Sequence, residues 1–326
     1  MTINRRTILA AAPAAALTAG APALAQQAAP AASPASEGQQ APGFYRFKVG
    51  DIEVTAIHDG FARRPLEGFI RNAEMADVQK AMQERFLPTD TLPIPFTTLV
   101  LRAGGRTTLL DTGNGDMGAP TSGRWMSNFK AAGFDPSAVD TVVISHFHGD
   151  HINGLRLKDG NAVFPKAEVM VPAAEWAFWM SDERMGQAPE AMRGAFQNVR
   201  RVFGPIAKDV KQYEGNKEVI SGVTAVPAPG HTPGHMTFAI QSGNGRLMVM
   251  SDTTNHPALF VRNPDWSAIF DMNADEARAT RRRLLETAAS ERMQVSFYHA
   301  PFPATGHIAK AGNGYEFVPV QWSNAM

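Results

Sequence analysis

The chain has 326 residues, of which 44% are hydrophobic and 19% are charged, and its formal net charge at pH 7 is zero. The 31 basic and 31 acidic residues provide no electrostatic field for a phosphate backbone, so no nucleic-acid partner is expected. The complete absence of cysteine excludes disulfides, zinc ribbons and thiol nucleophiles.

The first 25 residues have the organisation of a secretory signal peptide. Arg5 and Arg6 precede a weakly apolar, alanine-dominated stretch that ends in an Ala-x-Ala site at residues 23–25. The paired arginines resemble a twin-arginine signal, which bacteria use as an export address. The stretch contains prolines and is short for a membrane span, and no other segment is apolar enough to cross a bilayer. We therefore expect a periplasmic or secreted protein.

Residues 26–43 are composed mainly of Ala, Pro, Ser and Gln and show no periodicity. This composition predicts a disordered tether between the signal peptide and the domain. From residue 44 to residue 326, strand and helix patterns intermix without a further change in composition. The sequence therefore predicts one α/β domain over residues 44–326.

The elements of this domain are predicted from the spacing of apolar residues. Strands are expected at residues 45–49, 52–57, 96–101, 107–110, 141–144, 169–171, 223–226, 236–240, 247–250 and 295–298. Helices are expected at residues 73–86, 121–132, 173–180, 190–202 and 274–290. Asn273 is the expected N-cap of the last helix. The dense basic run Arg281-Arg282-Arg283 in that helix predicts a solvent-exposed face.

A dense group of potential metal ligands follows the strand predicted at residues 141–144. His146, His148, Asp150 and His151 lie within six consecutive positions. Imidazole nitrogens and carboxylate oxygens are ligands that zinc and similar ions prefer. Residues two apart in an extended chain face the same way, so His146 and His148 can share one ion. Asp150 and His151 are adjacent and point to different sides, so they can serve a second ion.

Three further candidates, His231, Asp252 and His299, each lie beyond a later predicted strand. Loops at one edge of a sheet can converge, which would bring these residues to the same site. Each residue alone is more typical of a structural histidine or a turn aspartate. The whole set together predicts a centre with two metal ions.

The run at residues 146–151 resembles the H-x-H-x-D-H signature of the metallo-β-lactamase superfamily, and Asp111-Thr112-Gly113 and residues 230–235 resemble two further patterns of that family. The resemblance implies an α/β fold, the four-layer αββα sandwich, with the metal centre at one edge of two sheets. It also implies the ligands: His146, His148 and His231 bind one ion, Asp150, His151 and His299 bind the other, and Asp252 bridges both. Zinc is the expected metal, with manganese, cobalt and iron as alternatives.

This ligand set predicts hydrolysis, with Asp252 and Asp150 as the candidate catalytic residues. Two divalent ions lower the pKa of bound water enough to give a nucleophile at neutral pH, so no protein nucleophile is needed. Asp252 is expected to hold the spacing of the ions and to accept a proton after attack.

Within the superfamily, the chain is most similar to the methyl parathion hydrolases and their lactonase relatives, through residues 42–46, 135–143, 302–308 and 315–320. This resemblance implies a small-molecule lactone, aryl ester or phosphotriester as substrate. It also implies that Trp179 and Phe196 line the substrate pocket, with core packing as the alternative. Asn255 stands where lactonase relatives carry a substrate-contacting tyrosine, which favours lactones and aryl esters over phosphotriesters.

Other functions remain open at this stage: a dedicated phosphotriester hydrolase, an oxidoreductase of the same fold, or a non-catalytic binding protein. His148 stands where flavo-diiron relatives have glutamate, which disfavours the oxidoreductase. The oligomeric state is also open, with a homodimer as one alternative. The remaining histidines and Asp59 are given lesser roles. His235 and Asp59 are expected beside the site, His307 is a rival of His299, His58 ends an early strand, and His256 is expected to be structural or pocket-lining.

Overall fold

The structure is a computed structural model that describes residues 41–323. The predicted signal peptide, residues 1–25, and nearly all of the predicted tether lie outside the described residues. From Pro42 onward the described residues form one compact unit. No helix in this part of the chain is both long enough and apolar enough to cross a membrane.

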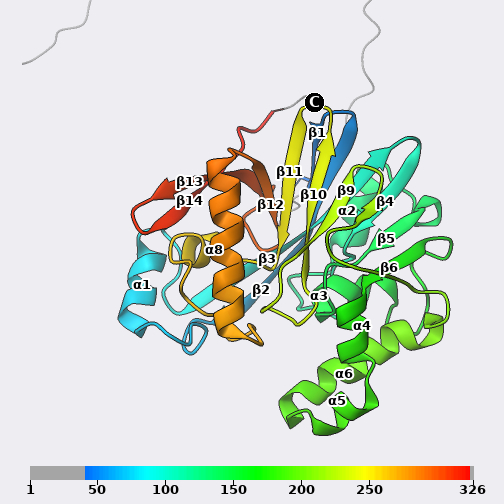
Figure 1. Ribbon diagram of the computed structural model, residues 1–326, viewed down its shortest axis with the longest axis horizontal. Helices are drawn as coiled ribbons and strands as arrows, with labels where there is room; N and C mark the ends of the chain where they lie inside the picture. The colour runs from blue at the N-terminus through cyan, green and yellow to red at the C-terminus, as the bar shows by residue number, and fades with distance from the viewer. Residues whose placement is uncertain (1–40, 324–326) are drawn as a thin grey trace, which may run out of the picture. The chain divides into compact units, whose positions relative to one another are not determined.

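The first sheet has seven strands in the order β1-β2-β3-β4-β5-β6-β7 (Figure 1). Its strands are β1 (Phe44–Val49), β2 (Ile52–Pro65), β3 (Thr91–Ala103), β4 (Arg106–Leu110), β5 (Thr141–Val143), β6 (Glu168–Pro172) and β7 (Lys211–Tyr213). Strands β1 to β4 pair antiparallel, and β4 to β7 pair parallel. Gly104 and Gly105 both have positive φ, as the tight turn between β3 and β4 requires.

The second sheet also has seven strands, in the order β14-β13-β12-β11-β10-β9-β8. Its strands are β8 (Glu218–Ile220), β9 (Val223–Pro227), β10 (Met236–Ser242), β11 (Gly245–Ser251), β12 (Gln294–Phe297), β13 (Thr305–Ala311) and β14 (Gly314–Pro319). Only β11 and β12 pair parallel in this sheet. As a result β9, β11 and β12 run in the same direction and end at the same edge.

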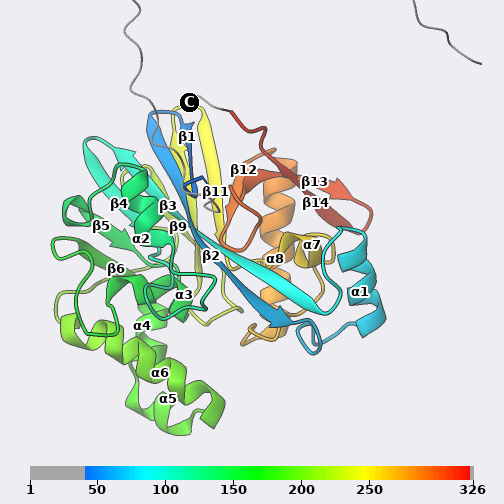
Figure 2. The same ribbon diagram turned by 180° about the vertical axis from the view of Figure 1, so that it is seen from behind.

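Helices cover the outer faces of both sheets (Figures 1 and 2). They are α1 (Met75–Gln83), α2 (Trp125–Ala131), α3 (Gly149–Ile152), α4 (Ala173–Trp179), α5 (Asp182–Gln187), α6 (Glu190–Phe203), α7 (Pro257–Phe260) and α8 (Ala274–Ser290). Helices α2, α4 and α6 pack on the first sheet and α8 packs on the second. Asn273 caps α8 by accepting a hydrogen bond from the backbone N–H of Glu276, as predicted.

The inner faces of the two sheets enclose an apolar core. Val54 and Leu101 of the first sheet and Phe238 and Leu247 of the second belong to this core, and each is at most 2% exposed. Burying one such side chain stabilises the fold by about 1.5–3 kcal/mol. The layers therefore run helix, sheet, sheet, helix, which confirms the predicted four-layer sandwich.

All predicted helices and strands are present, with bounds shifted by a few residues, but four strands were not predicted. Strands β7 and β8 have only three residues each, and β13 and β14 carry several exposed polar positions, so neither pair shows a strong apolar pattern. Strands β2 and β3 also run past the predicted bounds, through a bulge between His58 and Gly60. This extension brings the last residues of β2 to the site described next.

Candidate metal centre

The predicted ligands follow the carboxyl ends of strands from both sheets. His146 lies just after β5, His231 after β9, Asp252 directly after β11 and His299 after β12. Because these strand ends meet at one edge of the sandwich, residues far apart in the sequence lie side by side. His148 precedes the short helix α3, which carries Asp150 and His151.

The first group of potential ligands is His146, His148, His231 and Asp252. The His148 Nδ1 atom lies 3.1 Å from His146 Nε2 and 2.9 Å from His231 Nε2. Asp252 Oδ2 lies 3.2 Å from His231 Nε2 and 3.9 Å from His146 Nε2. Ligands placed tetrahedrally around a zinc ion are separated by about 3.3 Å, so these spacings suit one ion.

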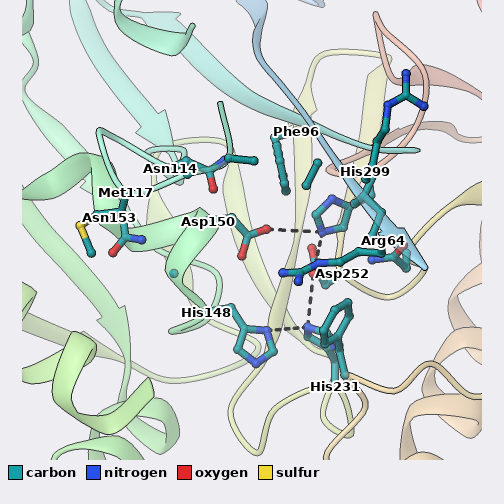
Figure 3. Close-up of a pocket in the computed structure, with 18 residues that line it drawn as sticks. Arg64, Phe96, Asn114, Met117, His148, Asp150, Asn153, His231, Asp252 and His299 are labelled. Atoms are coloured by element: carbon teal, nitrogen blue, oxygen red, sulfur yellow. Dashed lines mark hydrogen bonds and ion pairs between the residues drawn. The ribbon is translucent and has the colours of Figure 1, made fainter. Parts of the chain in front are cut away.

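The second group is Asp150, His151 and His299. Asp150 Oδ2 lies 3.5 Å from His151 Nε2 and 3.6 Å from His299 Nε2. Asp252 also contacts this group, because its Oδ1 lies 3.2 Å from His151 Nε2 and its Oδ2 lies 3.0 Å from His299 Nε2. The carboxylate of Asp252 therefore lies between the two groups, and Figure 3 shows it beside His299 and His231.

Two buried polar atoms in the cluster make no hydrogen bond: Nε2 of His151 and Oδ1 of Asp252. An unsatisfied buried polar atom costs about 1–3 kcal/mol. Burial lowers the pKa of His151, but Asp252 and Asp111 outweigh burial and raise that pKa well above its usual value. A divalent cation would satisfy both atoms and neutralise this negative charge. The nitrogen and oxygen donors present therefore fit two divalent ions.

The pKa shifts of His146, His148 and Asp252 favour metal binding. Burial, assisted by neighbouring histidines, lowers the pKa of His146 and of His148 well below 6.5. Both imidazoles are neutral at pH 7, the form that binds a metal. Burial raises the pKa of Asp252, but His299 and His151 outweigh burial and hold this pKa well below 3.8. Asp252 is therefore ionised.

Burial lowers the pKa of His231, but its contacts with Asp252 and Asp271 outweigh burial and raise that pKa to about 9. A metal ion must therefore displace a proton from this ring.

Hydrogen bonds on the outer side of the cluster orient the histidine rings. His151 Nδ1 contacts Asp111 Oδ2 at 2.8 Å, and Asp111 also accepts hydrogen bonds from the backbone and hydroxyl of Ser145. His299 Nδ1 donates to the carbonyl of Pro95 at 2.9 Å. Partners of this kind fix the tautomer of a ring and direct its other nitrogen toward the metal.

His235 lies beside the cluster, as predicted, and orients the loop after β11. Its Nδ1 donates to the carbonyl of Ala228 at 2.8 Å, and its Nε2 accepts the backbone N–H of Asp252 at 3.1 Å. Burial, together with His231, lowers the pKa of His235 to about 3, so the ring stays neutral and can accept this bond.

The prediction that the basic run at residues 281–283 is solvent-exposed is wrong for Arg281. Its side chain is 1% exposed, and it donates hydrogen bonds to the carbonyls of Thr253 at 2.8 Å and Trp266 at 2.6 Å. It also pairs with Asp271 at 3.2 Å, and Asp271 contacts His231 Nδ1 at 3.1 Å. The charge pattern of the sequence could not indicate that Arg281 is buried, because its acidic partner Asp271 lies in a loop that packs against α8.

A cavity of about 570 Å³ opens above the ligand groups. Its polar wall includes Asp150, Asp252, Asn114 and Asn153, and its apolar wall includes Ile94, Phe96, Met117 and Phe270. Asn255 also lines the cavity, and its buried Oδ1 atom has no hydrogen-bond partner. The cavity gives a small molecule access to the centre.

Trp179 and Phe196 do not line this cavity, which corrects the prediction for both residues. They are 2% and 0% exposed and pack against each other in the core between the first sheet and its helices, with ring centroids 4.8 Å apart. The indole N–H of Trp179 donates to buried Glu175 at 2.9 Å. Aromatic residues at helical spacing face the core here because α4 and α6 use that stripe to pack on the sheet.

The other histidines lie outside the ligand groups. His307 is exposed on β13, so His299 is the one that joins the cluster. His256 caps α7 and borders a different cavity, and burial lowers its pKa to about 4. Asp59 accepts hydrogen bonds from the backbones of Asn114 and Trp125 and so holds the loop after β4.

Comparison with known proteins identifies the family. The model of the metallo-β-lactamase superfamily matches residues 94–296, which is more than half of the chain. The chain belongs to the metallo-β-lactamase superfamily. It is a metal-dependent hydrolase of this fold, as predicted. The finer resemblance to methyl parathion hydrolases stays a prediction.

Individual members of the superfamily are similar over most of their length. An N-acyl homoserine lactonase of Bacillus sp is 23% identical over 231 residues, which cover 65% of this chain and 84% of the relative. The solved structure of AidC, a dizinc quorum-quenching lactonase in complex with a product, has a TM-score of 0.82 and 26% identity, and the match covers 86% of this chain and 99% of AidC. The hydrolase AbOPH shares the fold, with a TM-score of 0.82, 24% identity, and coverage of 88% of this chain and 100% of AbOPH.

Several residues at the site were not predicted from the sequence. They are Arg63, Arg64, Ile94, Phe96 and Phe270 on the cavity wall, and Asp271 behind His231. Strands β2 and β3 carry the first four of these residues. The alternation of Leu92, Ile94 and Phe96, which begins before the predicted start of the strand, was the pattern that could have indicated the two on β3.

Proposed function

We propose that this protein hydrolyses lactones and aryl esters, with phosphotriesters of the methyl parathion type as further substrates. The observation that carries the proposal is the position of Asp252, whose carboxylate contacts both ligand groups. The lactonase names of the Bacillus relative and of AidC support lactones as the substrate class.

In this proposal His146, His148 and His231 hold one divalent ion. Asp150, His151 and His299 hold the other, and Asp252 binds both; zinc is the proposed metal because AidC is a dizinc enzyme. Two such ions supply, when bound, a water acidic enough to attack at neutral pH and positive charge that polarises the substrate carbonyl.

The protein's own residues then position the substrate and move the proton. Asp252 is 5% exposed and keeps the two ligand groups at a fixed spacing. Asp150 has a side chain that is 23% exposed and lines the cavity, so its carboxylate can pass a proton to solvent. The apolar wall formed by Ile94, Phe96 and Phe270 excludes water from one side of the substrate.

The preference for a carbonyl substrate depends on Asn255. Its amide lines the cavity and can donate a hydrogen bond to the oxygen that gains negative charge during attack. We expect Asn255→Leu to lower the ratio of kcat/KM for dihydrocoumarin to that for methyl parathion by about tenfold, because a hydrogen bond to a charged group is worth 1.5–3 kcal/mol. The two ratios are measured on equally metal-loaded preparations. A wild-type preference for methyl parathion would instead indicate a dedicated phosphotriester hydrolase. If Asn255→Leu left the ratio unchanged, Asn255 would not determine the substrate preference.

We also propose that the protein is exported through the twin-arginine pathway. The paired Arg5 and Arg6 before the apolar stretch support this proposal. Replacing both arginines with lysine is expected to trap the precursor in the cytoplasm, which immunoblots of periplasmic and cytoplasmic fractions would detect. Normal export of the double variant would contradict the twin-arginine pathway and leave the hydrolase proposal intact.

A further inference from the structure

The cavity above the ligand groups has a cationic wall that the hydrolysis described above does not require. Arg63 and Arg64 lie at the end of β2, and both line the cavity. Figure 3 shows the side chain of Arg64 reaching into the cavity, between His148 and His299 in that view. A guanidinium in this position faces any molecule that reaches the metal centre.

Arg64 is anchored by its backbone and by an aromatic ring. Its backbone is opposite Leu92 in the ladder between β2 and β3. Its guanidinium carbon lies 5.9 Å from the ring centroid of Phe270, and that ring packs edge-on against Phe69 at 5.6 Å. A cation held against an aromatic face keeps its hydrogen-bond donors available for another group.

Arg64 has no acidic partner among the described residues. Within residues 41–323 neither Arg63 nor Arg64 forms an ion pair, whereas Arg281 and Arg282 pair with Asp271 and Asp265. The carboxylates that line the cavity are those of Asp150 and Asp252, which belong to the ligand groups. The positive charge on this wall is therefore available to a ligand.

We propose that Arg64 forms an anion-binding subsite and that the substrates of this enzyme carry a carboxylate away from the bond that is hydrolysed. The planar guanidinium can donate two parallel hydrogen bonds to a carboxylate, which is the strong geometry for this pair. Ile94, Phe96 and Phe270 line the same cavity and provide apolar surface for the uncharged part of such a substrate. This inference rests on the proposed hydrolysis of esters and lactones.

The test uses two aryl acetates that differ in one charge, 4-acetoxybenzoate and 4-acetoxybenzamide. For the wild type we expect the ratio of kcat/KM values to favour the benzoate, and Arg64→Gln is expected to lower this ratio by about tenfold, chiefly through KM. Arg64→Lys keeps the charge without the planar fork and should give an intermediate ratio. Arg193→Gln is the matched control, because Arg193 is exposed on α6 and does not line the cavity.

A second measurement does not depend on catalysis. Calorimetric titration of the metal-free protein with 4-hydroxybenzoate is expected to show binding that is about tenfold weaker in Arg64→Gln than in Arg193→Gln. Equal binding by the two variants, or an equal loss of activity on both esters, would overturn the subsite. If the metal-loaded wild type cleaves neither ester, the proposed function fails, and the titration still decides whether Arg64 binds a carboxylate.

Discussion

Replacing Asp252 with alanine is expected to lower kcat/KM for every substrate of this enzyme by about a thousandfold or more. Loss of an outer partner of a metal ligand typically costs 10–100-fold, and Asp252 is in contact with both ligand groups rather than behind one of them. The variant leaves the two groups without a shared ligand, so the spacing of the ions is lost. His151→Ala, which removes a ligand of the second group only, is expected to have a similar effect on activity.

The control for this prediction is Asp182→Ala, which also removes one carboxylate. The Asp182 side chain is 92% exposed on α5 and pairs with Arg200 at the surface. We expect this control to retain wild-type activity and metal content. If Asp252→Ala retained near wild-type turnover with a full complement of metal, the bridging position of Asp252 would be wrong.

Replacing Arg281 with methionine is expected to reduce the free energy of unfolding by about 3–5 kcal/mol, because it leaves the buried carboxylate of Asp271 without its cation. The carbonyls of Thr253 and Trp266 also lose their donor. Thr253 follows the ligand Asp252 in the chain, and Asp271 contacts the ligand His231. The affinity of the protein for metal should therefore fall as well. Urea unfolding and metal titration of the variant measure the two effects.

The neighbouring residue provides a matched comparison. Arg282 forms an exposed ion pair with Asp265, and surface pairs contribute at most about 1 kcal/mol. Arg282→Met is therefore expected to unfold close to the wild type. If the two variants were destabilised equally, the buried network around Arg281 would not contribute to the stability of the domain.

The sequence allowed the candidate ligands to be identified because each is tied to a local pattern, whereas their division into two groups was implied by the resemblance to the metallo-β-lactamase superfamily. His146, His148 and His151 share one short segment, and His231 and His299 each follow an apolar run that forms a strand. The direction of the strands brings these ligands together, since β9, β11 and β12 end at one edge of the sheet. The clear periodicity of the strands and helices predicted one α/β domain, and the resemblance to the superfamily implied the four-layer sandwich.

Much of the cavity wall could not be predicted, because it depends on which elements meet in three dimensions. Trp179 and Phe196 have the composition of a pocket lining, but the stripe they occupy packs against the first sheet. Arg281 is indistinguishable in sequence from its exposed neighbour Arg282, and only the loop that carries Asp271 makes it a buried residue. Residues of this kind are determined by tertiary packing rather than by local pattern.

Hydrolysis by this protein is expected to require two divalent ions, held by seven side chains of which Asp252 is shared. The most direct test is to titrate the metal-free protein with Zn²⁺ while measuring both bound metal and dihydrocoumarin hydrolysis. We predict that activity is absent without metal and reaches its plateau at two ions per chain in the wild type. Full activity at one bound ion, or activity in the metal-free protein, would contradict the account.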